Sequence, residues 1–388
     1  MPQGLEVDSA SRSLEDPSHK PTILMKITAI ETIVIQTPYS CGSPPPSLGG
    51  KTWTTADTLL VKVNTDEGVT GWGEAFGYNI IPATQAAIDQ VIAPQYIGRD
   101  PSQIEALMFE MQQKLHIFGR SGPAIFGLSG IDIALWDIAG KVAGRPVYQL
   151  LGGTARPKLT CYASLMRYTE PRLVAANTAR AVEQGFRFVK LHEIDVPQTK
   201  AAREAGGDSV NLMLDTNCPW SLKQAKDMAQ RLEEFALYWL EEPVWPPENY
   251  VALAELRAMT RIPVSAGENA TTVMSFQHMF ETRAVDFAQP SPTKMGGITE
   301  LRRIFTLASA HNVAMAPHTP YFGPGFLAGL HVNAAFPEET LVEWLYLDLE
   351  ASLYGDAIIP KNGMVTLPQG PGLGYDPDPA IIARYRAG

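Results

Sequence analysis

Three carboxylates in the middle of the chain recur at nearly constant spacing, each at the end of a short apolar run. Asp215 and Glu241 are 26 residues apart (241 − 215), and Glu241 and Glu268 are 27 apart (268 − 241). A short apolar run is typical of a fully buried parallel strand. The intervals have helical patterning, so each spans one strand and one crossover helix. Three acids at the carboxyl ends of successive parallel strands would therefore converge on one point.

The alternation of strand and helix extends from Lys158 nearly to the end of the chain. Eight segments have the length and composition of buried strands: Leu159–Ser164, Phe188–Leu191, Leu212–Asp215, Tyr238–Glu241, Val264–Gly267, Val285–Gln289, Val313–Pro317 and Leu341–Leu345. Eight strands in this order favour an α/β fold of the closed (β/α)₈ or TIM-barrel type, whose active site lies at the C-terminal strand ends. An open doubly wound sheet is the alternative, but no glycine-rich phosphate loop follows any of the strands.

The convergence of Asp215, Glu241 and Glu268 predicts a metal site. Like charges so close repel one another, and their burial without a cation is costly. Oxygen ligands suit a hard divalent ion, and Mg²⁺ is the leading candidate. A single carboxylate at a strand end is more often a surface or capping group. Three in succession at barrel spacing favour metal binding instead.

Residues 25–150 have a different pattern, with strands first and helices after, which predicts a small α+β domain. Within it, residues 40–53 form a loop rich in Pro and Gly that is long for a compact domain. Such a loop favours a lid or a binding element, with a surface excursion as the alternative. Residues 151–358 would form the barrel, and 359–388 would pack back on the first domain. Residues 1–24 are polar and are expected to be a flexible arm.

Composition excludes several classes of partner. The formal net charge is −10 and no basic block is present, so neither nucleic acid nor an anionic membrane is expected as a partner. No run is long and apolar enough for a signal peptide or a membrane span. Cys41, Cys161 and Cys218 are scattered and form no metal-binding spacing. They predict free thiols and a cytoplasmic protein.

Further polar residues follow the predicted strands. The second strand ends in Lys190-Leu-His192, so its alternation turns Lys190 and His192 to the same side. His318 follows the seventh strand, Glu343 lies in the eighth, and Asn217 lies two residues beyond Asp215. A metal bound to a substrate carboxylate would stabilise the enediolate formed when the α-proton leaves. A base on one face and an acid on the other would then complete the reaction.

These residues resemble a known family, the enolase superfamily in its mandelate racemase branch. The resemblance runs from about Met25 to the C-terminus and leaves out only the N-terminal arm. The segments that carry it are Gly127–Lys141, Pro146, Leu150–Gly153, Leu212–Asn217, Trp239–Pro243, Gly267-Glu268 and Gln289–Thr299. Together they are far more specific than a single short motif.

The resemblance implies an N-terminal α+β capping domain and a modified (β/α)₇β barrel. It also implies Mg²⁺ bound by the residues that match Asp215, Glu241 and Glu268. Specificity would come from capping-domain loops, here the stretch around 44–53. Members of the family dehydrate acid sugars, racemise, epimerise or cycloisomerise small carboxylates. Homo-oligomers, often dimers or octamers, are common among them.

Two positions depart from the branch. His192 stands where a second lysine is usual, and it is expected to accept a proton, contact substrate or bind the metal. Ser291 stands where an aspartate usually pairs with the histidine of the seventh strand. Without that carboxylate, His318 should be less basic and less firmly oriented. It could still donate a proton to a leaving hydroxyl.

The catalytic residues expected are therefore Lys190, His192, His318 and Glu343. Substrate contacts are expected from Asn217, Trp53, Thr319, Tyr346 and Ser291. The leading function is dehydration of an acid sugar, an aldonate or aldarate, to a 2-keto-3-deoxy acid. The alternatives are a racemase, epimerase or lactone cycloisomerase acting on a hydroxy acid, and a metal-binding homologue without catalysis. Two-base racemisation needs His318 to act as a base as well as an acid. Because Ser291 offers no carboxylate to make His318 more basic, racemisation is less favoured than dehydration.

Overall fold

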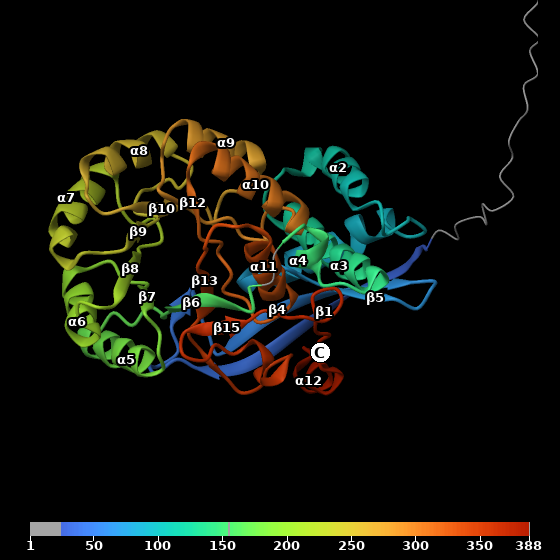
Figure 1. Ribbon diagram of the computed structural model, residues 1–388, viewed down its shortest axis with the longest axis horizontal. Coiled ribbons are helices and arrows are strands. Elements are labelled where there is room, and N and C mark those ends of the chain that lie inside the picture. Colours follow the sequence, from blue (N-terminus) through green and yellow to red (C-terminus); the bar gives the residue numbers. More distant parts are fainter. Residues whose placement is uncertain (1–24, 154–155, 388) are drawn as a thin grey trace, which may run out of the picture.

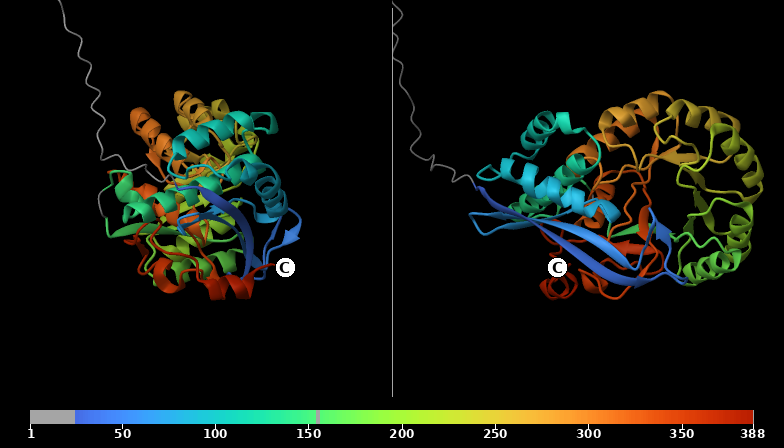
Figure 2. Two further views of the ribbon diagram at one scale, coloured as in Figure 1. Left: turned by 90° about the vertical axis from the view of Figure 1, so that its right-hand side faces the viewer. Right: turned by 180° about the vertical axis from the view of Figure 1, so that it is seen from behind.

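The computed structural model describes residues 25–153 and 156–387, and the predicted arm of residues 1–24 lies outside this part of the chain. An antiparallel sheet forms the N-terminal part, with strand order β14-β1-β4-β5. Its strands are β1 (Ile27–Ser40), β4 (Thr55–Thr65), β5 (Thr70–Ala75) and β14 (Asp348–Leu349). Strand β14 comes from the C-terminal part of the sequence. Figure 2 shows the long strands of this sheet extending from a layer of helices toward a ring of strands and helices.

Helices follow these strands along the chain, as the pattern predicts. They are α1 (Ile81–Ala87), α2 (Ile104–Lys114), α3 (Pro123–Ala143) and α4 (Val147–Leu150). Helix α3 lies directly against β5 because small residues allow it. A Cβ atom added at Gly73 would lie 1.8 Å from the Gly130 carbonyl oxygen. A side chain there would push the helix off the sheet.

The ring consists of parallel strands in the hydrogen-bonded order β12-β11-β10-β9-β8-β7-β6-β13 (Figure 1). The strands are β6 (Lys158–Ser164), β7 (Phe188–Leu191), β8 (Asn211–Asp215), β9 (Trp239–Glu241), β10 (Val264–Ala266), β11 (Phe287–Ala288), β12 (Ala314–Met315) and β13 (Val342–Leu345). All eight predicted strands are present, and their ends differ from the predicted ones by no more than two residues.

One helix follows each strand from β6 to β12. These helices are α5 (Pro171–Glu183), α6 (Val196–Gly206), α7 (Leu222–Leu232), α8 (Tyr250–Met259), α9 (Val273–Glu281), α10 (Gly297–His311) and α11 (Pro324–Ala335). The last strand, β13, leads instead to β14, which pairs with β1 of the N-terminal sheet. The modified (β/α)₇β barrel with an α+β domain is therefore confirmed.

The loop of residues 40–53 forms a small hairpin. Its strands are β2 (Ser47–Leu48) and β3 (Lys51–Thr52), and the Trp53 amide donates to the Pro46 carbonyl at 2.9 Å. The hairpin brings Trp53 toward the barrel mouth, where its side chain lines a cavity described below.

The C-terminal residues contact both parts of the molecule. Strand β15 (Met364–Thr366) pairs antiparallel with β6 of the barrel. Helix α12 (Pro379–Tyr385) leads to Ala387, whose amide donates to Val34 of β1 at 2.9 Å. The tail thus returns to the N-terminal sheet only after it has added a strand to the barrel. The division at residues 150 and 358 stays a prediction.

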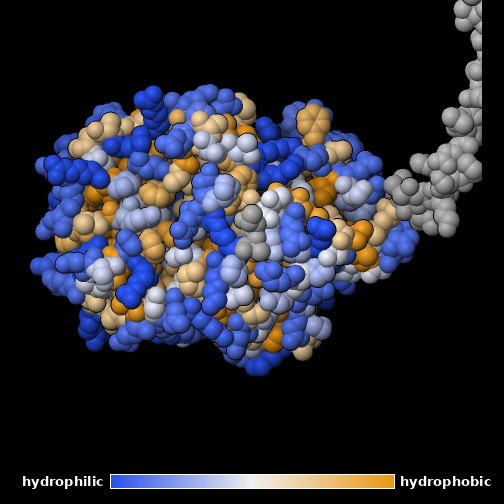
Figure 3. Space-filling model, in the orientation of Figure 1, coloured by the Kyte–Doolittle hydropathy of each residue, from blue (hydrophilic) through white to orange (hydrophobic). Residues whose placement is uncertain are grey.

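Apolar side chains fill the barrel wall and the space between the sheet and its helices. Figure 3 shows hydrophilic residues spread over one face of the molecule, with hydrophobic residues scattered between them. Among residues 25–153 and 156–387, no helix has the length and apolar character needed to cross a membrane.

Candidate active site at the barrel mouth

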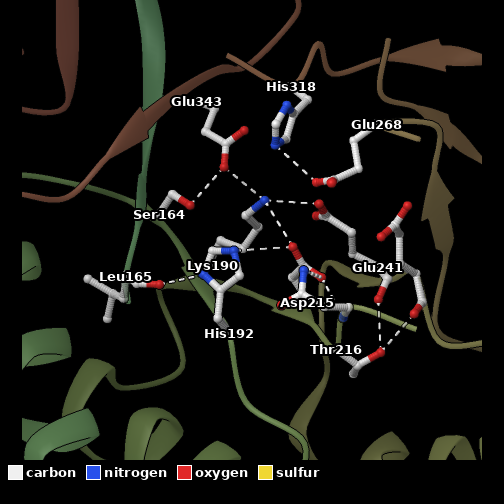
Figure 4. Close-up of polar contacts among 12 residues, drawn as sticks. Ser164, Leu165, Lys190, His192, Asp215, Thr216, Glu241, Glu268, His318 and Glu343 are labelled. Carbon is white, nitrogen blue, oxygen red and sulfur yellow. Dashed lines mark hydrogen bonds and ion pairs between the residues drawn. The ribbon is translucent and has the colours of Figure 1, made fainter. Parts of the chain in front are cut away.

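Asp215, Glu241 and Glu268 converge at the carboxyl ends of three adjacent strands (Figure 4). One oxygen from each lies within 4.8 Å of the others. Asp215 and Glu241 end β8 and β9 and are paired in register, and Glu268 lies two residues beyond the end of β10. The side chains of Asp215 and Glu241 are buried, and that of Glu268 is 14% exposed. The spacing in the sequence thus becomes a compact set of oxygen ligands.

Lys190 lies among these acids and is fully buried. Its Nζ is 2.9 Å from Glu241 Oε1, 2.9 Å from Glu343 Oε1 and 3.5 Å from Asp215 Oδ2. Burial alone would lower the pKa of this ammonium, but Glu241 and Glu343 outweigh it and raise the pKa well above its ordinary value. Lys190 therefore carries a fixed positive charge among the carboxylates.

The pKa values of Asp215 and Glu241 are shifted in opposite directions. Burial would raise the pKa of Asp215, but Lys190 and His192 bring that pKa down to about 2. Burial and the neighbouring charge of Asp215 raise the pKa of Glu241 well above its usual range. Four acids, Asp215, Glu241, Glu268 and Glu343, lie around two lysines, Lys190 and Lys294, so carboxylates outnumber ammonium groups. The donor set fits a divalent cation held by carboxylate oxygens.

His192 lies on the β7 side of the acids. Its Nδ1 faces the Leu165 carbonyl, and its Nε2 is 3.2 Å from Asp215 Oδ2. A carbonyl oxygen only accepts, so Nδ1 carries a proton. The ionised Asp215 carboxylate also only accepts, so Nε2 donates to it in this contact. Because Leu165 keeps a proton on Nδ1, Nε2 is the nitrogen that offers a lone pair on the side of the carboxylates once its own proton leaves.

His318 lies on the opposite side, beyond β12. Its Nε2 is 3.0 Å from Glu268 Oε2, and its Nδ1 is 3.3 Å from Ser291 Oγ and 3.4 Å from the Tyr321 hydroxyl. Ser291 and Tyr321 also contact each other. Two hydroxyls therefore occupy the place where the family usually has a carboxylate. Ser291 is buried behind His318 and does not line the cavity.

Glu343 and Thr319 form a buried pair beneath the acids. Glu343 accepts from Ser164 Oγ at 2.7 Å and from the Thr319 amide at 3.2 Å. Burial would raise the pKa of Glu343, but Lys190 and His318 lower it. Thr319 Oγ1 donates to the Glu343 carbonyl at 3.2 Å, so Thr319 orients Glu343 and does not reach the cavity.

A cavity of about 640 Å³ opens above the acids. Of the residues expected from sequence, those that line it are His192, Asn217, Glu268, His318, Glu343 and Trp53. Asn217 also donates through its amide side chain to Asp215 Oδ1 at 3.0 Å.

The structure places Tyr346, an expected substrate contact, outside the lining of this cavity. Its hydroxyl donates to Gln184 at 2.8 Å, and its ring lies beside Arg180 on the outer side of the strand. Side chains alternate along a strand, so Glu343 and Leu345 face the cavity while Trp344 and Tyr346 face away. Ser291 and Thr319 likewise lie outside the cavity lining, where they bond to His318 and Glu343.

Several cavity residues were not singled out from sequence. Lys294 Nζ lies 3.2 Å from Glu268 Oε1, and Arg167 donates to the His192 carbonyl at 2.8 Å. Phe76, Tyr78 and Phe126 come from the N-terminal domain. Lys294 lies inside the family-like segment Gln289–Thr299, which was the one available signal. The aromatic residues carried none, because isolated aromatics are usual in a core.

Two family models cover most of the chain. Residues 29–152 match the mandelate racemase/muconate lactonizing enzyme N-terminal domain, and residues 173–381 match the domain described as enolase C-terminal domain-like. The chain belongs to the mandelate racemase branch of the enolase superfamily. The resemblance drawn from the motifs is thus confirmed. Enzymes of the enolase superfamily bind a divalent metal, in keeping with the carboxylate set of this member.

Individual members of the superfamily are similar over nearly the whole chain. Arabinonate dehydratase of Saccharolobus solfataricus is 32% identical over 85% of this chain and 91% of its own. The 3,6-anhydro-D-galactonate cycloisomerase of Zobellia galactanivorans has a TM-score of 0.81 at 32% identity, covering 94% of this chain and all of its own. A magnesium complex from Paracoccus denitrificans PD1222 has a TM-score of 0.82 at 28% identity, covering 94% and 98%.

Proposed function

We propose that this enolase superfamily member is a Mg²⁺-dependent lyase that dehydrates an acid sugar, an aldonate or aldarate, to a 2-keto-3-deoxy acid. The observation that carries the proposal is the placement of two histidines on opposite sides of one carboxylate set. His192 Nε2 approaches Asp215 and His318 Nε2 approaches Glu268. An elimination that needs a base and an acid would use both sides.

The metal would be held by Asp215, Glu241 and Glu268. Their buried oxygens and unbalanced negative charge fit a hard divalent ion, and a related structure is a magnesium complex. When bound, Mg²⁺ would anchor the substrate carboxylate and stabilise the negative charge that develops as the α-proton leaves. Lys190 would add a positive charge next to the same acids.

His192 is the proposed proton acceptor. It lines the cavity, whereas Lys190 is buried beneath it with three carboxylates around its ammonium. Leu165 holds the His192 proton on Nδ1 and so leaves Nε2 as the basic atom. Lys190 is proposed to supply charge and to keep the acids in place.

His318 is the proposed acid. The Ser291 and Tyr321 hydroxyls orient its Nδ1 without the full negative charge of an aspartate. The Nε2 proton is on the cavity side, next to Glu268. Such a histidine suits proton donation to a departing β-hydroxyl better than the abstraction that two-base racemisation requires.

Cycloisomerisation is the second candidate. It uses the same first proton transfer, and the Zobellia galactanivorans relative is named for that reaction. If the β-oxygen belongs to a ring, its departure opens the ring without release of water. The product then separates the two outcomes, because dehydration changes the mass and ring opening does not.

Isotope exchange tests the assignment of the two histidines. Acid sugars incubated with the enzyme and Mg²⁺ in D₂O are followed by NMR for α-proton exchange and for ketoacid. His192→Asn should lose both by about 10²–10⁴-fold, the range of a general acid–base group. His318→Asn should lose ketoacid by a similar factor but retain exchange. His311→Asn, an exposed residue at the end of α10, serves as the control.

Full dehydration by His318→Asn would overturn the role of His318. Exchange with inversion of configuration would favour an epimerase. Tight Mg²⁺ binding without exchange across a broad panel would favour the non-catalytic homologue.

We also propose a homo-oligomer, a dimer or an octamer, located in the cytoplasm and acting on a small carboxylate. The family frequently assembles in this way. Size-exclusion chromatography with light scattering measures the assembly directly, and a monomeric mass would contradict it.

A further inference from the structure

His192 lies one residue beyond the point where the backbone ladder can hold it. The ladder between β7 and β8 ends at the pair Leu191 and Leu214. Asp215, by contrast, is still paired in register with Glu241 of β9. The 3.2 Å contact between His192 Nε2 and Asp215 Oδ2 therefore joins a ladder residue to one that other groups must hold in place.

Arg167 provides this hold from the loop after β6. Its Nε donates to the His192 carbonyl at 2.8 Å. Its Nη2 donates to the Thr216 carbonyl at 3.2 Å and to Asn217 Oδ1 at 3.0 Å. The side chain is half-buried and lines the cavity. One guanidinium thus ties together the segments that follow β6, β7 and β8.

The contacts on the β8 side fix the turn after Asp215. Asn217 has a φ of 55°, in the left-handed region that asparagine adopts more readily than most residues. Its backbone amide and its side-chain Nδ2 both donate to Asp215 Oδ1, at 2.9 and 3.0 Å. Because Nδ2 is turned to Asp215, Oδ1 is left to accept from Arg167. The arginine therefore holds this amide in one orientation.

The loop that carries Arg167, residues 165–169, is itself anchored. Glu193 is buried and accepts from two backbone amides of this loop, at 2.7 and 3.1 Å. Figure 4 shows the His192 ring between the Leu165 carbonyl of the same loop and the Asp215 carboxylate. The loop thus holds His192 by its ring as well as by its backbone.

Arginine suits this place because its planar guanidinium donates in several fixed directions at once, which the single ammonium of lysine does not. We propose that Arg167 is a positioning residue for the proton transfer, and that its bonds to the His192 carbonyl and to the turn after Asp215 fix the direction of His192 Nε2. The inference rests on the role of His192 proposed above. Arg167 acts through His192 and takes no proton itself.

Arg167→Gln tests the inference, because it removes the planar fork. Exchange of the α-proton is followed by NMR in D₂O, with Mg²⁺ and the acid sugar that the parent enzyme exchanges fastest. The kcat for exchange should fall about 10²-fold, the cost of misplacing a reacting group by roughly 1 Å, while KM stays within about 3-fold. Mg²⁺ affinity by calorimetry should also stay within about 3-fold, since Asp215 keeps its register with Glu241. A rise in KM with kcat unchanged would make Arg167 a substrate contact and overturn the inference.

Arg203→Gln is the matched control. Arg203 on α6 also donates to backbone carbonyls. They belong to Gly207, Val210 and Phe235, at 2.9, 2.8 and 3.0 Å, and none of these residues lines the cavity. The control should lower resistance to urea about as much as Arg167→Gln but leave kcat within about 2-fold. An equal fall in kcat in both variants would mean a general loss of structure and would overturn the inference.

Arg167→Lys decides the question if Arg167→Gln shows no cooperative unfolding transition in urea. Lysine keeps the charge but not the fork, so kcat should fall about 10-fold with KM unchanged. An unchanged kcat in this variant would contradict the positioning role.

The proton on His192 Nδ1 gives a readout that needs no substrate. Its bond to Leu165 should slow its exchange with solvent, and its NMR signal is assigned by its loss in His192→Asn. Arg167→Gln should speed this exchange by at least about 10-fold, and Arg203→Gln should not. An unchanged rate in Arg167→Gln overturns the inference even if the parent exchanges α-protons. Faster exchange in Arg167→Gln, with no α-proton exchange by the parent on any acid, supports the hold on His192 and contradicts the proposed function.

Discussion

The two halves of the cavity are built in different ways. On the barrel side, adjacent strands each contribute one or two charged side chains, and Asp215 and Glu241 are locked in register by the ladder between β8 and β9. On the capping side, aromatic rings come from the hairpin loop, from the end of β5 and from α3, with no shared ladder among them. The charged side chains of the cavity thus come mainly from the barrel, and its aromatic wall comes from the capping domain.

The difference teaches how one site can combine fixed chemistry with variable recognition. A charged group must be placed within a fraction of an ångström, and hydrogen-bonded strands provide that rigidity. An apolar wall needs only surface at the right distance, so loops suffice. Substitutions on the barrel side should therefore affect the reaction, and those on the capping side should affect the choice of substrate.

The largest effect is expected at the metal ligands. Glu241→Gln keeps the shape of the side chain and an acceptor for Trp239, whose indole donates to Glu241 at 2.9 Å. It removes the charge that a cation needs, so kcat/KM should fall by about 10³-fold or more and Mg²⁺ affinity should fall with it. Steady-state kinetics and calorimetry measure both. Glu248→Gln, an exposed change nearby, should do neither.

Substitution of Lys190 tests whether Mg²⁺ and this lysine both offset the negative charge of the same carboxylates. Lys190→Met leaves the surrounding carboxylates unbalanced, so the free energy of unfolding should fall by about 3 kcal/mol in EDTA. Saturating Mg²⁺ should recover part of this loss, because the ion binds only the folded site. Urea denaturation with and without Mg²⁺ measures the difference. Lys200→Met, which removes an exposed ion pair to Glu204, is the control.

An unchanged deficit in Mg²⁺ would mean that the ion does not bind at these carboxylates. The proposed metal-dependent reaction on the barrel side of the cavity would then be contradicted.

Glu74 connects the N-terminal domain to the barrel. Its side chain on β5 accepts a hydrogen bond from the Gly325 amide, in the first turn of α11, at 2.9 Å. Burial raises the pKa of Glu74 from 4.5 to about 8. Its stabilising contribution is complete below about pH 4.5 and is lost as pH rises through 8. We expect this carboxyl to cost roughly 2 kcal/mol of unfolding free energy between pH 6 and pH 8.

Glu74→Gln should remove that part of the pH dependence, whereas Glu67→Gln on the exposed turn before β5 should not. Urea denaturation at several pH values provides the measurement. A Gln variant with the same slope as the parent would show that the carboxyl is not held neutral at this junction.

The smallest effect is expected at Tyr346. Tyr346→Phe removes a hydrogen bond to Gln184 outside the cavity, so the free energy of unfolding should fall by about 1 kcal/mol. The values of kcat and KM should stay within about 2-fold of the parent, since the effect is only on stability. A large rise in KM would indicate that Tyr346 contacts substrate, which would contradict this prediction.

Much of the barrel was predictable from sequence. Short apolar runs with helices between them predicted all eight strands, and the acids at the ends of three successive runs predicted the carboxylate set. Lys190 and His192 followed from alternation within one strand. These predictions depend on local periodicity and on a symmetric fold, and both are visible in a single chain.

Three of the expected substrate contacts lie outside the cavity lining in the structure. Thr319 and Ser291 lie next to catalytic positions in sequence but turn into the supporting layer, where they bond to Glu343 and His318. Tyr346 lies just past the end of β13 and faces outward. Proximity along the chain does not specify the direction of the Thr319 and Ser291 side chains, which lie beyond their strands, whereas alternation from Glu343 already turns Tyr346 outward.

Residue spacing in this chain was enough to establish a parallel barrel and the carboxylate set, because both follow from the repeat of one strand and one helix. The aromatic wall could not be inferred in this way. Trp53, Phe76 and Phe126 are separated by stretches of chain with no common period, and they meet only because β5 packs against α3 and the hairpin folds over the barrel mouth. Contacts between distant segments depend on packing in three dimensions, and the spacing of residues along one sequence does not show which segments pack together.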